Sequence, residues 1–382
     1  MPQRTQKKRR PALQIVSIAL AIFMAGCSIA PEKMSPIHPS VDTEAKTLRY
    51  RATIDRVGLG SGDGFKRFLV GDDSHDLERP VSIGLRDDIM YIFDAGDGYI
   101  FRYSLVDGRM DPMAGVGAEV AEDATDIYVA ADHSFYLADI EGRRVLHFDP
   151  DGNLIRSYFH GPNISRPVAV SVNEDNGEVF VADEVYSHVV VFNKRGEPLR
   201  GIGGRGEGPG KFRIITDMIK TADGFYLSDR IELSVQVLDN EGRYLTHFGE
   251  GQLIFPTALT VDNFGRVYVS EKNESIIKVF QQGKLIDVIG SNGYGRGEFR
   301  FVSDMKVHKG YLYVADSLNG RVQVFEILPP AKAQPVLEKS PASKPSTKET
   351  QPVQPESVPA APGENPAEQT SVDQKSAMLL LP

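Results

Sequence analysis

The strongest constraint on this chain is a period of about 45 residues in its middle part. Short runs of β-branched and aromatic residues end in an acid six times, at Asp94, Asp139, Asp183, Asp229, Glu271 and Asp316. The spacings between these acids are 45, 44, 46, 42 and 45 residues. A tight-turn dipeptide ending in glycine follows at the same period, at Gly108, Gly152, Gly196, Gly242 and Gly283. Such glycines supply the positive φ of hairpin turns. Four short strands in each repeat are typical of β-propeller blades.

The sixth period lacks its last strand. After Val324 and Phe325 no glycine turn follows, only Leu328-Pro329-Pro330. Residues 48–58, in contrast, stand before the first repeat without a blade of their own and resemble the fourth strands. We therefore predict an all-β, six-bladed β-propeller of four-stranded blades over residues 48–327. The N-terminal strand would complete blade six and remove two open sheet edges.

Residues 1–26 are predicted to be a lipoprotein signal peptide. Basic residues crowd the first ten positions, an apolar stretch follows, and the only cysteine, Cys27, comes directly after Met24-Ala25-Gly26. This pattern resembles the bacterial lipobox, in which the cysteine is acylated and becomes the mature N-terminus. A plain signal peptide with a chance cysteine is the alternative. We expect a lipid-anchored cell-envelope protein with a tether over residues 27–47, and Ser28 favours the outer membrane.

Residues 328–382 form a second compositional regime. From Pro329 onward there is no aromatic residue, and this stretch holds 11 of the 24 prolines. Such a segment cannot bury enough apolar area to offset its conformational entropy. We predict a disordered, Pro-rich tail.

The repeats resemble NHL repeats, most clearly over residues 255–269 and 310–325. The whole chain is similar to bacterial six-bladed propeller lipoproteins. That family includes binding platforms, sensor domains and a few metal-dependent lyases and hydrolases. The resemblance therefore implies the fold and leaves the activity to be argued from the sites.

Composition excludes several function classes. With 43 Lys and Arg against 52 Asp and Glu, the chain carries a net charge of −9, which argues against nucleic-acid binding. A single cysteine excludes an internal disulfide, a four-cysteine metal site and a c-type haem attachment. The amidating lyases that share this fold hold zinc through histidines around the channel, but none of the eight histidines here begins an inner strand. We predict no cofactor; Ca²⁺ or Zn²⁺ enters only under an enzyme alternative.

Three aspartates are candidate binding residues at the mouth of the central channel. They stand at the start of the inner strands of blades two, four and six, at Asp126, Asp217 and Asp304. The matching residues of blades one, three and five are Ser82, Ala169 and Ala258. A pseudo-threefold ring of carboxylates could bind a hard cation such as Ca²⁺, or a cationic group of a partner. The alternative is that each aspartate accepts local backbone N–H groups at a blade junction.

Two glycine-rich segments, 201–212 and 290–299, precede blades four and six. Neither contains the G-K-[ST] of a phosphate-binding loop, and their recurrence with the blades indicates inter-blade connections. They would carry basic side chains onto one face as candidate partner contacts, namely Arg205, Lys211, Arg213, Arg296 and Arg300.

These features together predict a protein-binding or scaffolding module whose partner is another envelope protein. Similar lipoproteins occur in bacteria rich in multihaem cytochromes, so the resemblance also implies an accessory role in an envelope electron-transfer complex. The alternative function is that of a metal-dependent lyase or hydrolase acting at the channel mouth.

Overall fold

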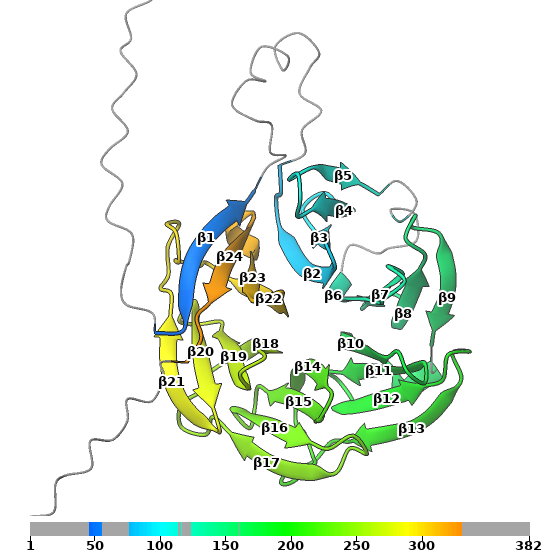
Figure 1. The fold of residues 1–382 in the computed structure, drawn as a ribbon. Coiled ribbons are helices and arrows are strands. Elements are labelled where there is room, and N and C mark those ends of the chain that lie inside the picture. The colour runs from blue at the N-terminus through cyan, green and yellow to red at the C-terminus, as the bar shows by residue number, and fades with distance from the viewer. Residues whose placement is uncertain (1–45, 56–75, 114–115, 117–123, 160, 331–382) are drawn as a thin grey trace, which may run out of the picture. The chain divides into compact units, whose positions relative to one another are not determined.

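The computed structural model describes residues 46–55, 76–113, 116, 124–159 and 161–330. They form a ring of six four-stranded antiparallel sheets (Figure 1). This confirms the predicted six-bladed β-propeller. The predicted signal peptide, Cys27 and nearly all of the tether lie outside the described residues, as does the tail beyond residue 330.

The strands follow the predicted order, from the innermost to the outermost strand of each blade. Blade one contains β2 (Pro80–Arg86), β3 (Ile89–Asp94), β4 (Tyr99–Ser104) and β5 (Met110–Pro112). Blade two contains β6 (Ala124–Val129), β7 (Phe135–Asp139), β8 (Arg144–Phe148) and β9 (Leu154–Tyr158). Blade three contains β10 (Pro167–Asn173), β11 (Glu178–Asp183), β12 (His188–Phe192) and β13 (Pro198–Gly203).

Blade four contains β14 (Ile215–Thr221), β15 (Gly224–Asp229), β16 (Ser234–Leu238) and β17 (Tyr244–Phe248). Blade five contains β18 (Pro256–Val261), β19 (Arg266–Glu271), β20 (Ile276–Gln281) and β21 (Lys284–Ile289). Blade six contains β22 (Val302–His308), β23 (Tyr311–Asp316), β24 (Arg321–Ile327) and β1 (Leu48–Ile54). The described helical segments are two 3₁₀ turns, η1 (Gly161–Asn163) and η2 (Ser317–Asn319). Neither is long or apolar enough to cross a membrane.

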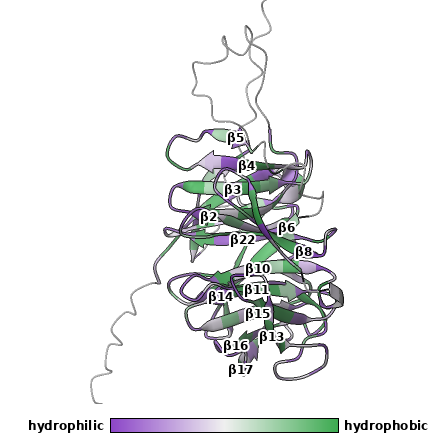
Figure 2. Ribbon diagram, turned by 90° about the vertical axis from the view of Figure 1, so that its right-hand side faces the viewer, coloured by the Kyte–Doolittle hydropathy of each residue, from purple (hydrophilic) through white to green (hydrophobic). Residues whose placement is uncertain are grey.

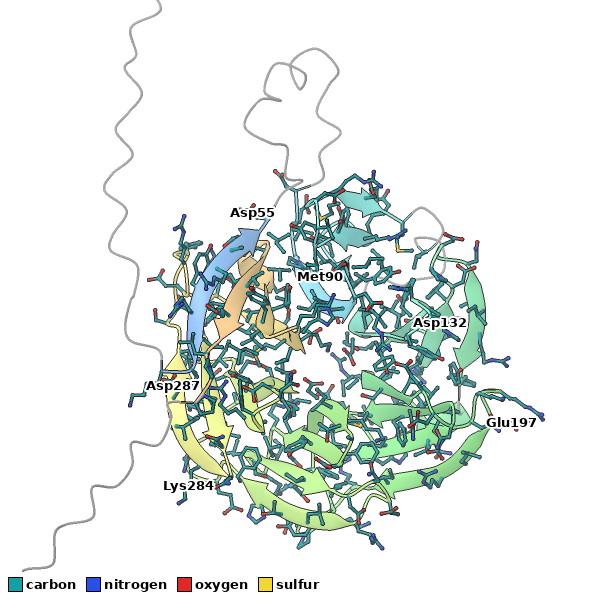
Figure 3. The ribbon with its side chains drawn as sticks, in the orientation of Figure 1. Asp55, Met90, Asp132, Glu197, Lys284 and Asp287 are labelled. Carbon is teal, nitrogen blue, oxygen red and sulfur yellow. The ribbon has the colours of Figure 1, made fainter. Side chains whose placement is uncertain are left out.

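The N-terminal strand completes blade six, as predicted. β1 pairs antiparallel with β24, from Leu48 opposite Ile327 to Ile54 opposite Val322. The side chains of Leu48 and Ile54 are buried. Thr47 adds a tie to blade five, since its N–H and Oγ1 lie 3.1 and 2.7 Å from Oδ2 of Asp287 (labelled in Figure 3). The first and last blade strands of the chain therefore share one sheet.

The strand order defines two faces of the ring. Because the strands of each blade are antiparallel and consecutive, all six inner strands begin at the same face, which we call the entry face. The loops between second and third strands, and the connections to the next blade, lie there too. The opposite face, the exit face, carries the hairpins between first and second strands and between third and fourth strands.

The hydrophobic core lies between neighbouring blades. In Figure 2 strands such as β3, β10 and β11 are hydrophobic along their middle, whereas the connecting loops are largely hydrophilic. Phe180 of blade three meets Phe225 of blade four edge to face, with ring centroids 5.0 Å apart. Both rings are buried, and burying one such ring stabilises a fold by about 2 kcal/mol. Each blade thus depends on its neighbours for burial of its faces.

The recurring acid that ends the second strand holds the connection into its blade. Oδ2 of Asp183 accepts hydrogen bonds from the N–H groups of Ser165 and Arg166, at 2.7 Å each, and Oδ1 accepts one from Tyr186 at 2.8 Å. Asp94, Asp229 and Glu271 hold the equivalent segments of their blades in the same way. These bonds explain why an acid recurs with the period, and they fix the residues that precede each inner strand at the entry face.

The glycine-rich segments are inter-blade connections, as the sequence indicated. Each folds back on itself through a β-bridge, Arg205 with Phe212 and Asn292 with Phe299. The two phenylalanines are fully buried. At Gly290, with φ of 89°, an added Cβ would lie only 2.4 Å from the Phe299 ring, so the loop requires glycine there.

Candidate functional site

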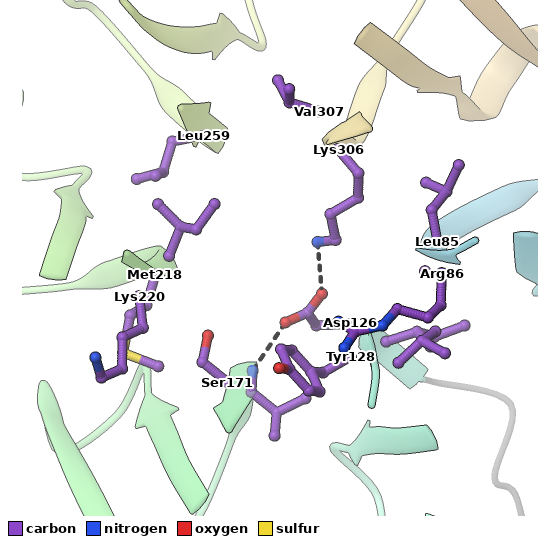
Figure 4. Close-up of a pocket in the computed structure, with 15 residues that line it drawn as sticks. Leu85, Arg86, Asp126, Tyr128, Ser171, Met218, Lys220, Leu259, Lys306 and Val307 are labelled. Atoms are coloured by element: carbon purple, nitrogen blue, oxygen red, sulfur yellow. Dashed lines mark hydrogen bonds and ion pairs between the residues drawn. The ribbon is translucent and has the colours of Figure 1, made fainter. Parts of the chain in front are cut away.

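The inner strands surround a channel with a cavity at each mouth. The cavity at the entry face has a volume of about 290 Å³, and Asp126, Asp217 and Asp304 all line it. The cavity at the exit face has a volume of about 190 Å³ (Figure 4). Asp126 lines both cavities. The structure therefore brings the three predicted aspartates together around the entry cavity, and Asp126 also reaches the exit cavity.

Each of these aspartates binds the backbone of the following blade. Oδ2 of Asp126, Asp217 and Asp304 accepts a hydrogen bond from the N–H of Val170, Leu259 and Ile83, at 2.8, 2.7 and 2.9 Å. These N–H groups belong to blades three, five and one, where the matching residue is small. The alternation seen in the sequence therefore has a structural meaning. Blades two, four and six supply the carboxylate that accepts the hydrogen bond, and blades three, five and one supply the backbone N–H that donates it. The structure places the aspartates as backbone acceptors, and their binding of a ligand or partner stays a prediction.

Lys306 is the central residue that sequence reasoning missed. From β22 its Nζ lies 2.9 Å from Oδ1 of Asp126 and 2.9 Å from Oδ1 of Asp304. Figure 4 shows the side chain reaching across the channel to Asp126. The available signal was a lysine two residues after Asp304, which strand alternation places on the same face of the inner strand as that aspartate.

One ammonium group faces three buried carboxylates, and this arrangement shifts pKa values within the cluster. Burial raises the pKa of Asp126, and Lys306 offsets part of that rise. Burial raises the pKa of Asp217 well above its usual range, and the neighbouring Asp126 and Asp304 add to the rise. Burial acts to lower the pKa of Lys306, but the carboxylates outweigh it, so that pKa is raised. Asp217 makes no ion pair with any described residue, although Asp126 and Asp304 both do.

The carboxylate oxygens offer little to a metal ion. Most already accept a backbone N–H or the Lys306 ammonium group. Within the described residues no group of three or more His, Cys, Asp or Glu side chains could hold a metal. His147 stacks on Tyr136, and His308 contacts Asp87 O at 2.7 Å on the exit face. The described residues therefore do not fit the Ca²⁺ or Zn²⁺ that the enzyme alternative would require.

A row of charged and aromatic side chains borders the entry mouth over blades three to six. We call it the rim arc, and it consists of Arg166, Glu184, Arg230, Phe255, Lys272 and Phe301. Glu184 pairs with Arg166 at 2.5 Å and with Arg230 at 3.1 Å. The Arg230 guanidinium and Lys272 Nζ each lie 5.3 Å from the centre of the Phe255 ring. Sequence reasoning missed this arc, because its members come from separate repeats.

The five predicted basic contacts all lie on the connections of the entry face, and all are exposed. Arg213 pairs with Glu207 at 3.2 Å, and Lys211 Nζ donates to Gly203 O at 3.1 Å. The Arg300 guanidinium lies 5.2 Å from the Tyr294 ring centre, and that of Arg296 lies 5.5 Å from the Tyr50 ring centre. The structure thus places Arg205, Lys211, Arg213, Arg296 and Arg300 on one face. Their contact with a partner stays a prediction.

Comparisons with known proteins agree on the fold. A family described as a 6-bladed beta-propeller matches residues 167–248. The structure of a streptogramin B lyase aligns with a TM-score of 0.53 and 10% identity, over 74% of this chain and 99% of that one. A protein of unknown function from Bacteroides thetaiotaomicron aligns with a TM-score of 0.52 and 14% identity, over 66% of this chain and 70% of the other. Virginiamycin B lyase from Staphylococcus aureus aligns with a TM-score of 0.48 and 12% identity, over 66% of this chain and 97% of that one.

No curated protein sequence matches the chain. At identities this low the two structural matches with TM-scores above 0.5 carry information about the fold alone. By fold, then, the chain is a six-bladed β-propeller.

Proposed function

We propose that this propeller is a protein-binding module that docks its partner on the entry face. The observation that carries the proposal is an asymmetry of exposed apolar side chains between the loops of the two faces. Those on the entry-face loops are Phe159, Val185, Tyr186, Ile231, Ile254, Tyr294 and Leu318. Those on the exit-face hairpins are Val106 and Phe264. The other exposed apolar side chains lie within strands, mostly the outermost strand of a blade, at Tyr99, Leu154, Ile155, Leu199, Leu245, Leu285, Val288 and Tyr311. Apolar side chains gathered on one face are typical of interaction surfaces.

The loops that carry these side chains are held in place by their own blades. Arg321 donates hydrogen bonds to the carbonyl oxygens of Tyr294, Gly295 and Glu298, at 2.8 to 2.9 Å. Asp183 holds Tyr186 through its N–H. A preorganised surface loses less conformational entropy when it binds. Exposed tyrosine and arginine side chains on such a surface are the residue types that dominate binding energy at protein interfaces.

The setting of the module is proposed from the sequence. The basic start, the apolar stretch and Cys27 support a lipid-anchored envelope protein of the NHL-like propeller type, at the outer membrane. The partner would then be another envelope protein. An accessory role in an envelope electron-transfer complex is the specific setting that we propose to test first.

The lyase or hydrolase alternative draws support from the fold that this chain shares with streptogramin B lyase. It has less support in the channel. The three aspartates there accept backbone N–H groups, and Lys306 pairs with Asp126 and Asp304. The described residues contain no metal-binding group. We therefore favour binding over catalysis.

The proposal is tested by co-purification of the lipoprotein from mildly solubilised envelopes. Ile231→Glu places a charge on the entry face, and Phe264→Glu is the matched control on the exit face. The two side chains are 44% and 43% exposed, so neither substitution should change folding. We expect wild type and Phe264→Glu to retain the same partner and Ile231→Glu to lose it by about tenfold or more. Recovery of the bare wild-type chain, or equal retention by both variants, would overturn the proposal.

A further inference from the structure

We infer that the partner presents an acidic, apolar polypeptide segment. Its carboxylates bind entry-face cations that have no internal counter-ion, above all Lys272, Arg296 and Arg300. The inference rests on the proposed function, because it names the chemistry of the partner at the entry face.

The acidic side chains around the rim arc and on the neighbouring connections already form ion pairs or hydrogen bonds within the protein. Glu184 is shared by Arg166 and Arg230, and Glu207 pairs with Arg213. Oε2 of Glu298 accepts a hydrogen bond from the N–H of Gly295 at 2.8 Å. None of these acids forms an ion pair with another cation of the entry face among the described residues.

Several cations on the loops and connections of the entry face, in contrast, have no carboxylate within ion-pair distance among the described residues. They are Arg205, Lys211, Lys272, Arg296 and Arg300. All five are exposed. A cation without an internal counter-ion keeps its charge available for an incoming group.

Aromatic rings hold three of these cations, Lys272, Arg296 and Arg300, in defined positions. The Arg296 guanidinium lies 5.5 Å from the centre of Tyr50. Lys272 Nζ lies 5.3 Å from the centre of Phe255 and 5.4 Å from that of Phe301. The Arg300 guanidinium lies 5.2 Å from the centre of Tyr294, whose side chain is 72% exposed. A cation–π contact attracts the cation by about 0.5–1 kcal/mol at an exposed site but does not neutralise it. Each pair therefore presents a positioned charge beside an apolar ring.

An acidic polypeptide fits this surface better than other anions do. Its carboxylates would form charge-assisted hydrogen bonds with Lys272, Arg296 and Arg300. Its apolar side chains would cover Tyr294, Ile254 and Phe301, which a bare phosphate backbone or lipid headgroup would leave exposed.

The test measures binding of a labelled peptide of alternating Glu and Phe to the purified protein by fluorescence anisotropy. The triple variant Lys272→Gln, Arg296→Gln and Arg300→Gln removes the positioned cations. The control triple Lys194→Gln, Lys284→Gln and Lys309→Gln removes the same charge from the exit face. We expect the first variant to bind about tenfold or more weakly and the control to bind like wild type. Wild-type affinity should fall several-fold between about 50 and 200 mM salt, because the contacts are ionic.

Equal weakening by both triples, affinity that is independent of salt, or tighter binding of a DNA duplex or phosphatidylserine vesicles would overturn the inference. Co-purification of the natural partner distinguishes a failure of this inference from a failure of the proposed function. A partner that depends on Ile231 but not on the three cations would leave the proposed function standing and remove the acidic segment. A wild-type chain that captures no partner would remove the proposed function, whatever the peptide does.

Discussion

Lys306 of β22 and Asp126 of β6 meet across the central channel, with Nζ 2.9 Å from Oδ1. Their blades, six and two, are not neighbours in the ring, because blade one lies between them. The ion pair therefore links two blades across the central channel, in addition to the contacts between neighbouring blades around the ring. Lys306 also binds Asp304, so one ammonium group compensates two buried carboxylates.

Loss of the Lys306 ammonium should destabilise the ring. Lys306→Met keeps the length of the side chain but leaves Asp126 and Asp304 without their cation. Removing one partner of a buried ion pair costs about 3 kcal/mol, so we expect the free energy of unfolding to fall by about that amount. Urea denaturation checks this. Lys309→Met is the control, since Lys309 pairs with Asp88 at the surface and should cost less than about 0.5 kcal/mol. Equal costs for the two variants would contradict the prediction.

The raised pKa of Asp217 predicts a pH dependence of stability. A carboxyl whose pKa is higher in the folded than in the unfolded state stabilises the fold fully only below its unfolded pKa, about 3.9. That contribution is lost as pH rises through the folded pKa. Asp217→Asn cannot ionise. Its free energy of unfolding should therefore improve relative to wild type as pH rises from about 4 to 8.

Urea denaturation across this pH range measures the difference between the two proteins. Asp175→Asn, on an exposed exit-face hairpin, provides the control and should follow the wild-type curve. A constant difference between wild type and Asp217→Asn at all pH values would show that Asp217 ionises in the folded protein as readily as in the unfolded chain.

The sequence predicts most of the fold but only part of the site. Strand order and ring closure follow from local signals, namely a strand, an acid and a glycine turn that repeat at one period. The alternation of Asp126, Asp217 and Asp304 is visible in the sequence. Its partners are not, because an N–H group in the next blade leaves no mark on side-chain identity. Lys306 and Asp126 are 180 residues apart, and only the closed ring brings them together.

In the glycine-rich connection 290–299, substitution by alanine should destabilise the protein strongly at one glycine and only slightly at another. Gly290 and Gly297 both have positive φ, 89° and 74°. A Cβ at Gly290 would lie 2.4 Å from the Phe299 ring, whereas a Cβ at Gly297 would meet nothing within 4 Å. Both substitutions by alanine carry the backbone cost of about 1 kcal/mol, and Gly290→Ala adds overpacking of about 1–3 kcal/mol. Thermal unfolding should therefore rank Gly290→Ala well below Gly297→Ala, and equal melting temperatures would refute the packing argument.

The strand β1 should be required for the stability of the whole ring. A chain that begins at residue 56 loses the sheet partner of β24 and the burial of Leu48 and Ile54. Burial of these two side chains alone stabilises the fold by about 3–6 kcal/mol, which is comparable to the whole stability of many domains. We expect the shortened chain to unfold at much lower urea concentration or to aggregate through the exposed edge of β24.

Adding a synthetic peptide of residues 46–56 should raise the unfolding midpoint of the shortened chain in proportion to the logarithm of peptide concentration, because only the folded ring binds it. The double variant Arg49→Ala and Arg51→Ala is the control. It removes surface ion pairs with Glu326 but keeps the strand, so it should stay within about 1 kcal/mol of wild type. An unchanged melting curve for the shortened chain would show that blade six is stable with three strands and that β1 is a dispensable cover.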